Sequence, residues 1–463
     1  MRLRDIVATK QPFAAVRASA TLAAMLRPTS ILLPLLAACA SAAPPQEPPL
    51  APATAFVGAR ILPIDGPPIE RGVLVVRDGK IEAVGRVDDV KLPAGALVVE
   101  LDGKTLMPGL VCSHSHIGSV AGADASGPIQ PEVRALDSIN PRDPGIQKAQ
   151  AGGITTVNIM PGSGHLLSGQ TIYVKLRDAR TVEEMAIRNA DGGIAGGIKM
   201  ANGTNPQKDA PFPGTRGKSA ALMRAQLHRA REYARKIADA AGDAAKMPER
   251  SLGLEALVEV LEGKRVVHHH THRQDDILTV LRLAEEFGFR VVLHHVSEGW
   301  VVADEIAAAK APCSVIVIDS PGGKVEAARL SLETGAILDR AGALVGFHTD
   351  DGITDSRLFL RSPALAVRAG MDRQKALEAV TIANARMLDL QDRVGTLTVG
   401  KDADFVVLSG DPLSVYTRVL QTWVEGTKVF DYDDPQDRLF ADGGYGASAD
   451  QSISMCCYGQ GGQ

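Results

Sequence analysis

The feature that most constrains the fold is an alternation of short apolar runs with helical stretches along the middle of the chain. Runs rich in Val, Ile and Leu are separated by segments with helical spacing or by loops. This pattern is typical of a parallel sheet whose strands are joined by crossover helices. Eight runs in this order predict an α/β fold with a closed (β/α)8 TIM barrel. The predicted strands cover residues 110–116, 153–160, 171–176, 196–200, 265–270, 290–295, 313–318 and 343–348.

The segments before and after this region are rich in β-forming residues. Residues 54–106 consist of short alternating runs broken by Gly, Pro and Asp, and similar runs return over residues 393–432. Asp78-Gly79 between two such runs predicts a β-hairpin. We therefore expect a small β-sandwich domain built from both chain ends, beside a barrel domain of residues 107–392.

Three further segments carry their own signals. Residues 218–247 are rich in Ala and Arg with apolar positions at helical spacing, which predicts a helix. The Gly- and Pro-containing residues 203–217 before it predict a long loop. Residues 433–463 are rich in Asp and Gly and have no apolar period, so we expect a disordered tail.

The start of the chain is typical of an export signal. Residues 1–38 carry basic residues followed by a short apolar run, and they end at Leu36-Ala37-Ala38-Cys39. This ending resembles the bacterial lipobox, in which the cysteine is lipidated, and either Met1 or Met25 can be the true start. Residues 39–53 are rich in Pro and Ala and predict an extended tether. The sequence thus predicts an exported protein, lipid-anchored to the membrane at Cys39 and facing the periplasm or cell exterior.

Composition narrows the classes of partner. The chain has 463 residues, 45% of them hydrophobic, which suffices for a large buried core. Its 50 basic and 54 acidic residues give a net charge of −4, so the basic excess that phosphate binding needs is absent. We expect no nucleic acid partner and contact with the membrane through the lipid anchor only. A homo-oligomer is left open.

Histidines gather at the ends of the predicted strands. His114-Ser115-His116 closes the first strand, where residues two apart share a face, so both imidazoles can hold one metal ion. By the same alternation His294 and His295 face opposite ways. Active sites of (β/α)8 barrels are built from the C-terminal ends of the strands. The set also includes His268, His269, His270 and His272, and it is completed by Asp350 after the last strand.

These motifs resemble those of a known family. Residues 108–116, with His270, His295 and Thr349-Asp350, are similar to the metal motifs of the amidohydrolase superfamily, in its imidazolonepropionase-like and prolidase-like branch. Residues 393–408 resemble the return of that family into its small β-sandwich. The resemblance covers roughly residues 54–432 and implies a metal-dependent hydrolase with a barrel and a composite β-sandwich.

The resemblance also implies which residues hold metal. His114 and His116 would bind a first ion together with Asp350, and His270 and His295 would bind a second. In binuclear members a carbamylated lysine on the fourth strand bridges the two ions. Lys199 in residues 196–200 is favoured for this role, and Lys175 takes it if the third strand is counted differently. We expect one or two divalent ions, with zinc favoured by imidazole and carboxylate ligands.

The expected activity is hydrolysis of a C–N bond in an amide or cyclic amide by a metal-activated water, with a small-molecule amide or a short peptide as substrate. Asp350 is the expected catalytic residue, taking a proton from the water and passing it to the leaving nitrogen. One alternative is a prolidase-like dipeptidase or carboxypeptidase. Another is a catalytically silent surface lipoprotein that binds metal or a ligand.

Overall fold

The structure, a computed structural model, describes residues 51–120, 124–316 and 325–443. The predicted export signal, Cys39, the tether up to residue 50 and the tail beyond residue 443 lie outside the described residues. So does the end of the predicted strand 313–318. The described residues fall within one unit, Ala51–Gln463. Among them, no helix is both long and apolar enough to cross a membrane.

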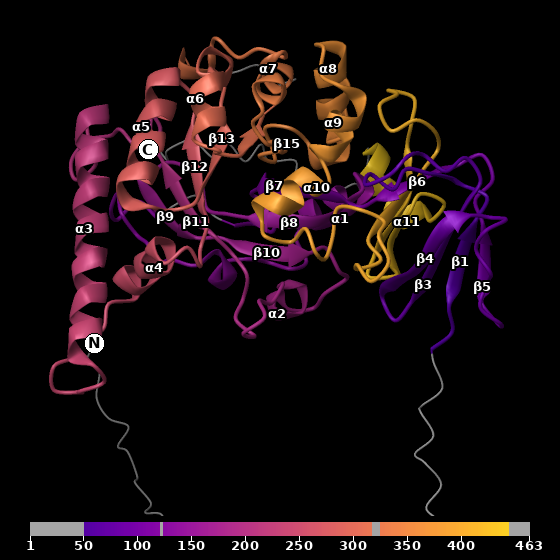
Figure 1. Cartoon of the computed structure of the whole chain (residues 1–463), viewed down its shortest axis with the longest axis horizontal. Coiled ribbons are helices and arrows are strands. Elements are labelled where there is room, and N and C mark those ends of the chain that lie inside the picture. The colour runs from indigo at the N-terminus through magenta and orange to yellow at the C-terminus, as the bar shows by residue number, and fades with distance from the viewer. Residues whose placement is uncertain (1–50, 121–123, 317–324, 444–463) are drawn as a thin grey trace, which may run out of the picture. The chain divides into compact units, whose positions relative to one another are not determined.

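Short buried strands form the centre of a mixed α/β fold (Figure 1). Every predicted run overlaps a strand, and consecutive strands pair in parallel along most of the sequence. One sheet contains β7 and β8 in parallel, and a second contains five strands in parallel, in chain order. These strands are β7 (Leu110–Ser115), β8 (Ile154–Ile159), β11 (Ile198–Ala201), β12 (Val267–Thr271), β13 (Val291–His295), β14 (Cys313–Val315) and β15 (Val345–Phe347).

The third predicted run departs from the parallel order. It forms β10 (Ile172–Lys175), which pairs antiparallel with β8. Just before it lies β9 (Leu167–Gln170), which was not predicted and pairs antiparallel with β11. The connection from Met160 to Leu166 is shorter than the dozen or so residues that a parallel crossover needs, so the chain turns directly back. The expectation of parallel pairing was wrong for this segment, which still lies between β8 and β11.

Strands β15 and β7 approach each other at the open edges of the two sheets. Just beyond β15, the backbone N–H of Asp350 donates to the carbonyl of His114 at 3.0 Å. Among the described residues, β7 and β15 belong to separate sheets and are not hydrogen-bonded neighbours. Complete closure into a barrel stays a prediction, while the contact brings residues after β15 against the end of β7.

Eleven α-helices of the described residues cover the strands and their edges (Figure 1). They are α1 (Pro144–Ala151), α2 (Val182–Met185), α3 (Arg216–Ala240), α4 (Leu252–Leu261), α5 (Gln274–Phe287), α6 (Ala303–Ala308), α7 (Thr334–Ala341), α8 (Arg361–Arg368), α9 (Arg373–Glu378), α10 (Ile382–Met387) and α11 (Pro435–Asp442). Short 3-10 turns cover Ala135–Asp137, Gly299–Val301, Val325–Ala327 and Ser356–Leu358.

Two helix expectations need correction. The predicted helix 218–247 is α3, which ends at Ala240 because Ala241 adopts a left-handed conformation with φ of 47°. The expected disorder from residue 433 is wrong for Pro435–Asp442, which form α11. Asp434 caps this helix by accepting from the N–H of Gln436 at 2.8 Å, and α11 packs against α1 and β18.

The β-rich ends form two sheets, ordered β4-β3-β1-β5 and β18-β17-β16-β6-β2. Phe56 of the first sheet packs edge-on against Phe405 and Trp423 of the second, with ring centroids 4.8 and 4.9 Å apart. A separate β-sandwich domain stays a prediction. The strands are β1 (Thr54–Val57), β2 (Arg60–Ile61), β3 (Gly72–Arg77), β4 (Lys80–Arg86), β5 (Leu97–Glu100), β6 (Thr105–Pro108), β16 (Phe405–Leu408), β17 (Val419–Val424) and β18 (Thr427–Asp431).

The predicted hairpin at Asp78-Gly79 is confirmed. It joins β3 to β4, which pair antiparallel. Both turn residues have positive φ, 50° and 72°, as a tight two-residue hairpin turn requires.

Candidate metal centre

Histidines from four strands converge on one buried region. All but His268, near the start of β12, lie at or close to the C-terminal ends of β7, β12, β13 and β15, where the sequence places its metal motifs. A buried carboxylate, Asp350, follows β15 and is only 5% exposed. The buried imidazoles that gather here are His114, His116, His268, His270, His272, His294, His295 and His348.

His114, His116 and Asp350 form one group with metal-ligand character. Asp350 Oδ1 lies 2.9 Å from His116 Nε2 and 3.3 Å from His114 Nε2. The two Nε2 atoms are 3.3 Å apart. Ligand atoms at about 2.0–2.2 Å from a tetrahedral zinc ion are separated by roughly 3.3 Å. The three atoms therefore fit the ligand set of one divalent ion.

A hydrogen bond fixes which nitrogen of His116 can bind metal. His116 Nδ1 lies 2.7 Å from the backbone carbonyl of Met160. A carbonyl oxygen only accepts, so Nδ1 must carry the proton. In the neutral ring Nε2 is then left with its lone pair, which is the form that binds metal.

A second group consists of His270, His272 and His295, whose ligand atoms lie within 4.8 Å of one another. His295 Nε2 is buried and has no hydrogen-bond partner among the residues that the structure describes. Burying a polar nitrogen without a partner is costly, so an ion at this position would supply what the fold leaves out. His272 of this group is buried, and its ring stacks on that of His295.

The two candidate lysines occupy different environments. Lys199 is fully buried, and its Nζ lies 3.2 Å from His114 Nε2. Lys175 is also fully buried, but its Nζ lies 2.5 Å from Asp404 Oδ2 and 2.9 Å from Asp402 Oδ2. The structure thus brings Lys199 to the histidines, while Lys175 forms an ion-paired cluster.

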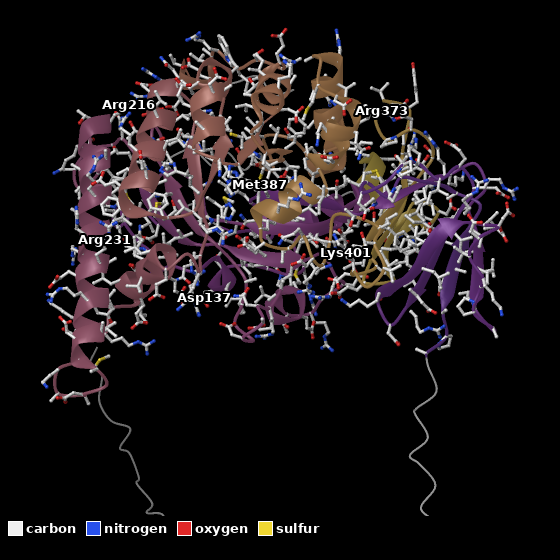
Figure 2. The ribbon with its side chains drawn as sticks, in the orientation of Figure 1. Asp137, Arg216, Arg231, Arg373, Met387 and Lys401 are labelled. Atoms are coloured by element: carbon white, nitrogen blue, oxygen red, sulfur yellow. The ribbon has the colours of Figure 1, made fainter. Side chains whose placement is uncertain are left out.

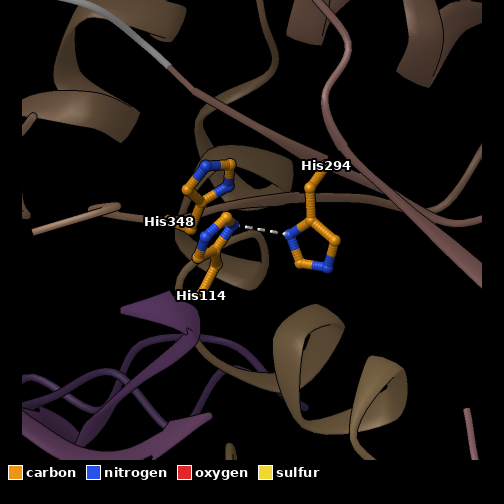
Figure 3. Close-up of side chains that lie close together, drawn as sticks. All are labelled: His114, His294 and His348. Atoms are coloured by element: carbon orange, nitrogen blue, oxygen red, sulfur yellow. Dashed lines mark hydrogen bonds between the residues drawn. The ribbon is translucent and has the colours of Figure 1, made fainter. Parts of the chain in front are cut away.

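Three deeper histidines were not selected as ligands from the sequence. His294 Nδ1 lies 3.2 Å from His114 Nδ1, and His348 stacks on His114 with 4.8 Å between ring centroids (Figure 3). His294 Nε2 lies 2.9 Å from His268 Nδ1. His268 Nε2 in turn lies 2.9 Å from the Tyr173 hydroxyl. These contacts make a continuous buried chain from Tyr173 to His114.

Strand alternation fails at His294 and His295. Both rings join the same buried cluster, although adjacent residues of a strand normally face opposite ways. His295 has φ of 72° and Val296 has φ of 54°, so the backbone leaves the extended conformation at this point. This turn at the end of β13 is a local feature that alternation alone does not predict.

The electrostatics keep the site in its metal-binding forms. Burial opposes the charged form of Asp350, but the close contact with His116 and the nearby Lys199 outweigh it and hold its pKa below the usual range. Burial, and then Lys199, lower the pKa of His114 well below its usual value. Burial also lowers the pKa of His348 to about 3. An ionised Asp350 beside neutral His114 and His348 rings results, which is the state that a divalent ion needs.

A further carboxylate beside this centre was missed in the sequence. Glu326 is buried, and its Oε1 lies 3.9 Å from His270 Nε2. Its Oε2 accepts from the N–H of Thr204 at 2.8 Å and lies 3.6 Å from Arg216 Nη2, at the start of α3 (Figure 2). No motif marks Glu326, because its position depends on three segments that are distant in sequence.

Comparisons with known proteins find similarity over most of the chain. The model of the amidohydrolase family matches residues 105–435. Amidohydrolase tasK of Hapsidospora irregularis is 28% identical over 394 residues, which are 78% of this chain and 39% of that protein. The chain thus spans about two fifths of that curated relative. A structure of an amidohydrolase from Thermotoga maritima MSB8 is 34% identical, with a TM-score of 0.77 over 82% of this chain and all of that chain. A proposed prolidase from Bifidobacterium longum shares the fold, at 18% identity and a TM-score of 0.53 over 82% of this chain and 95% of that chain.

Proposed function

The chain belongs to the amidohydrolase family, and on this premise we propose that it is a metal-dependent amidohydrolase that hydrolyses a C–N bond with a metal-activated water. The observation that carries the proposal is the buried group of His114, His116 and Asp350. Its ligand atoms are spaced as they would be around one divalent ion. A second group of imidazoles, with His295 Nε2 lacking a hydrogen-bond partner among the described residues, lies beside it.

In the proposed centre, His114, His116 and Asp350 hold one divalent ion, and His270 and His295 hold a second. The nitrogen and oxygen donors favour zinc. When bound, such ions acidify a water molecule and polarise the carbonyl of the substrate.

Lys199 is the proposed bridge between the two ions, as a carbamate on its Nζ. Its full burial beside His114 supports this assignment, because a buried ammonium is costly to desolvate. Lys175 is the less favoured choice, because Asp402 and Asp404 already neutralise its charge.

Asp350 is the proposed catalytic residue. Its carboxylate accepts a proton from the attacking water and delivers it to the leaving nitrogen, which is acid and base catalysis by one group. The depressed pKa of Asp350 keeps the carboxylate ionised and able to accept that proton. The hydrogen bond from His116 Nδ1 to the Met160 carbonyl holds the His116 ring in place beside Asp350 during this transfer.

The test is turnover by the purified full chain on a panel of amides, cyclic amides and Xaa-Pro dipeptides. We expect hydrolysis of at least one class, lost on chelation and restored by zinc. Asp350→Asn should lower kcat by about 10²- to 10⁴-fold, the usual contribution of acid and base catalysis. Asp304→Asn, which changes an exposed carboxylate on α6, should not.

The panel also separates the alternatives. Turnover confined to Xaa-Pro dipeptides would favour the prolidase-like dipeptidase. A metal-loaded wild-type protein that hydrolyses no member of the panel would contradict the proposal and favour a silent binding protein.

We further propose that the protein is exported and lipid-anchored through Cys39. The basic and apolar start of the sequence and its lipobox-like ending support this. Labelling of cells with a radioactive fatty acid should mark the wild-type protein and leave Cys39→Ala unlabelled. Equal labelling of both would contradict the anchor.

A further inference from the structure

We propose that Asn384 is a positioning residue that sets the protonation site of His295 through a relay of Ser113, Ser314 and His348. The inference rests on the proposed role of His295 as a metal ligand. It concerns residues outside the ligand set, from α10, β7, β14 and the end of β15.

The relay is a chain of short contacts between buried side chains. Ser113 Oγ donates to Asn384 Oδ1 at 3.1 Å and lies 2.7 Å from Ser314 Oγ. Ser314 Oγ lies 2.7 Å from His348 Nδ1. His348 Nε2 lies 3.2 Å from His295 Nδ1. The first four residues are fully buried and His295 is 2% exposed, so water does not compete for these contacts.

The backbone fixes the orientation of the Asn384 amide. Asn384 Nδ2 donates to the carbonyls of Val111 and Phe347, both at 2.6 Å. The opposite orientation would place the amide oxygen against two carbonyl oxygens, none of which can donate. Asn384 Oδ1 therefore faces Ser113 and must accept.

The direction of every other hydrogen bond follows from this one. Because the single hydroxyl proton of Ser113 goes to Asn384, Ser113 must accept the proton of Ser314. Ser314 then has no proton to give His348, so His348 Nδ1 carries a hydrogen and donates. In a neutral ring this leaves His348 Nε2 as an acceptor, and His295 Nδ1 must donate to it.

The result is a His295 ring whose Nε2 keeps its lone pair. This is the buried atom that lacks a hydrogen-bond partner among the described residues, and it lies with His270 and His272. The fold thus prepares His295 to bind through Nε2 before any ion arrives.

The same contacts explain why His348 is assigned to the relay. It belongs to two groups with metal-ligand spacing, one of them with His114 and His294 (Figure 3). Both ring nitrogens of His348 already have partners, Ser314 and His295. A metal bound at His348 would break one of these hydrogen bonds.

The test reads histidine protonation directly, by ¹⁵N NMR of metal-free full-length protein labelled at histidine. In the wild type, His348 and His295 should both be protonated at Nδ1. Ser314→Ala removes the acceptor of His348 Nδ1. We expect the proton of His348 to move to its Nε2, which then donates to His295 Nδ1. The proton of His295 should in turn move to Nε2. Zinc affinity should then fall by about 10- to 100-fold, the usual effect of losing a supporting hydrogen bond.

Asn384→Ala should have the same two effects. If Asn384→Ala does not fold, the smaller change Ser314→Ala still tests the inference. Ser219→Ala is the matched control, because Ser219 is a buried serine of α3 with one hydrogen bond, to the carbonyl of Thr215. It should leave both histidines and the zinc affinity unchanged.

Wild-type His348 or His295 protonated at Nε2 would overturn the inference without any variant. So would Ser314→Ala with unchanged protonation and zinc affinity within twofold of the wild type. Neither readout requires turnover, so a protein with the relay but without amide hydrolysis would contradict the proposed function alone.

Discussion

His116 and His295 illustrate how single atoms determine chemistry at the residue scale. Each ring has its Nδ1 engaged by a neighbour, the Met160 carbonyl in one case and His348 in the other. Each therefore presents Nε2 toward the centre. The sequence indicates which histidines can gather, but the protonation of each ring depends on contacts with residues far away in the chain.

Tyr173 ends the other chain of buried rings, which leads through His268 and His294 to His114. Tyr173→Phe removes the hydroxyl that contacts His268 Nε2 and leaves a buried nitrogen without its partner. We expect the free energy of unfolding to fall by about 1–3 kcal/mol, measured by urea denaturation of metal-free protein.

The matched control is Tyr416→Phe, because Tyr416 is 90% exposed. Its effect should lie within about 0.5 kcal/mol of zero. Equal stability of the two variants would show that the contact of the Tyr173 hydroxyl with His268 contributes nothing to the free energy of unfolding.

At the scale of elements, β10 is tied to the segment before β16 by the buried ion pairs of Lys175 with Asp402 and Asp404. These pairs join residues more than 220 positions apart in sequence, as the contact of Lys175 with Asp404 shows. Lys175 was therefore hard to distinguish from Lys199 in the sequence, where both are lysines in short apolar runs. The acidic partners that separate them become visible only when the chain folds.

The ion pairs of Asp402 predict how the stability of the protein depends on pH. Burial raises the pKa of Asp402, but Lys175, Lys80 and Arg393 outweigh it and lower the value from 3.8 to about 2. A carboxyl whose pKa is depressed by folding stabilises the native state above the unfolded value and loses this contribution as pH falls through the folded value. The stability advantage of the wild type over Asp402→Asn should thus be full at about pH 6 and shrink between about pH 4 and pH 2.

Denaturant unfolding across this range measures the advantage, with Asp88→Asn as a control because Asp88 is exposed. An advantage of Asp402 that stays constant from about pH 6 to pH 2 would contradict the ion-pair account.

The end of α3 gives a second prediction for an element. Ala241 is exposed and left-handed, with φ of 47°, a conformation that costs a residue with a side chain about 1–2 kcal/mol. Ala241→Gly should therefore raise the free energy of unfolding by up to about 1 kcal/mol. Ala238→Gly, inside the same helix, should lower it by about 1 kcal/mol. A loss of stability in both variants would contradict the left-handed cap.

The strands and helices also show how far the sequence predicts this fold. Apolar runs located every central parallel strand, because burial on both faces leaves a continuous apolar signal. They did not give the reversal at β9 and β10, which depends on the short connection before Leu167. Helix α11 was missed because none of its residues is buried, so it has no apolar period to detect.

At the scale of the whole molecule, the site depends on residues from the full length of the described chain. The convergence of His114, His270, His295 and Asp350 is predictable, because each lies at or just beyond the end of a strand and resembles a family motif. Ser314, His348, Asn384 and Glu326 are not, since each acquires its role only from neighbours on other elements. The family and the metal motifs are thus apparent from the sequence, whereas the surroundings that tune them require the structure.

Metal content per chain is the most decisive measurement for the proposed two-ion centre, by elemental analysis of zinc-supplemented protein that starts after Cys39. We expect two ions per wild-type chain and one or fewer in Lys199→Ala. Lys80→Ala, which removes a half-exposed lysine paired with Asp402, should retain both ions. A wild-type chain without bound metal would contradict the account, and a single ion that is insensitive to Lys199→Ala would contradict the two-ion centre.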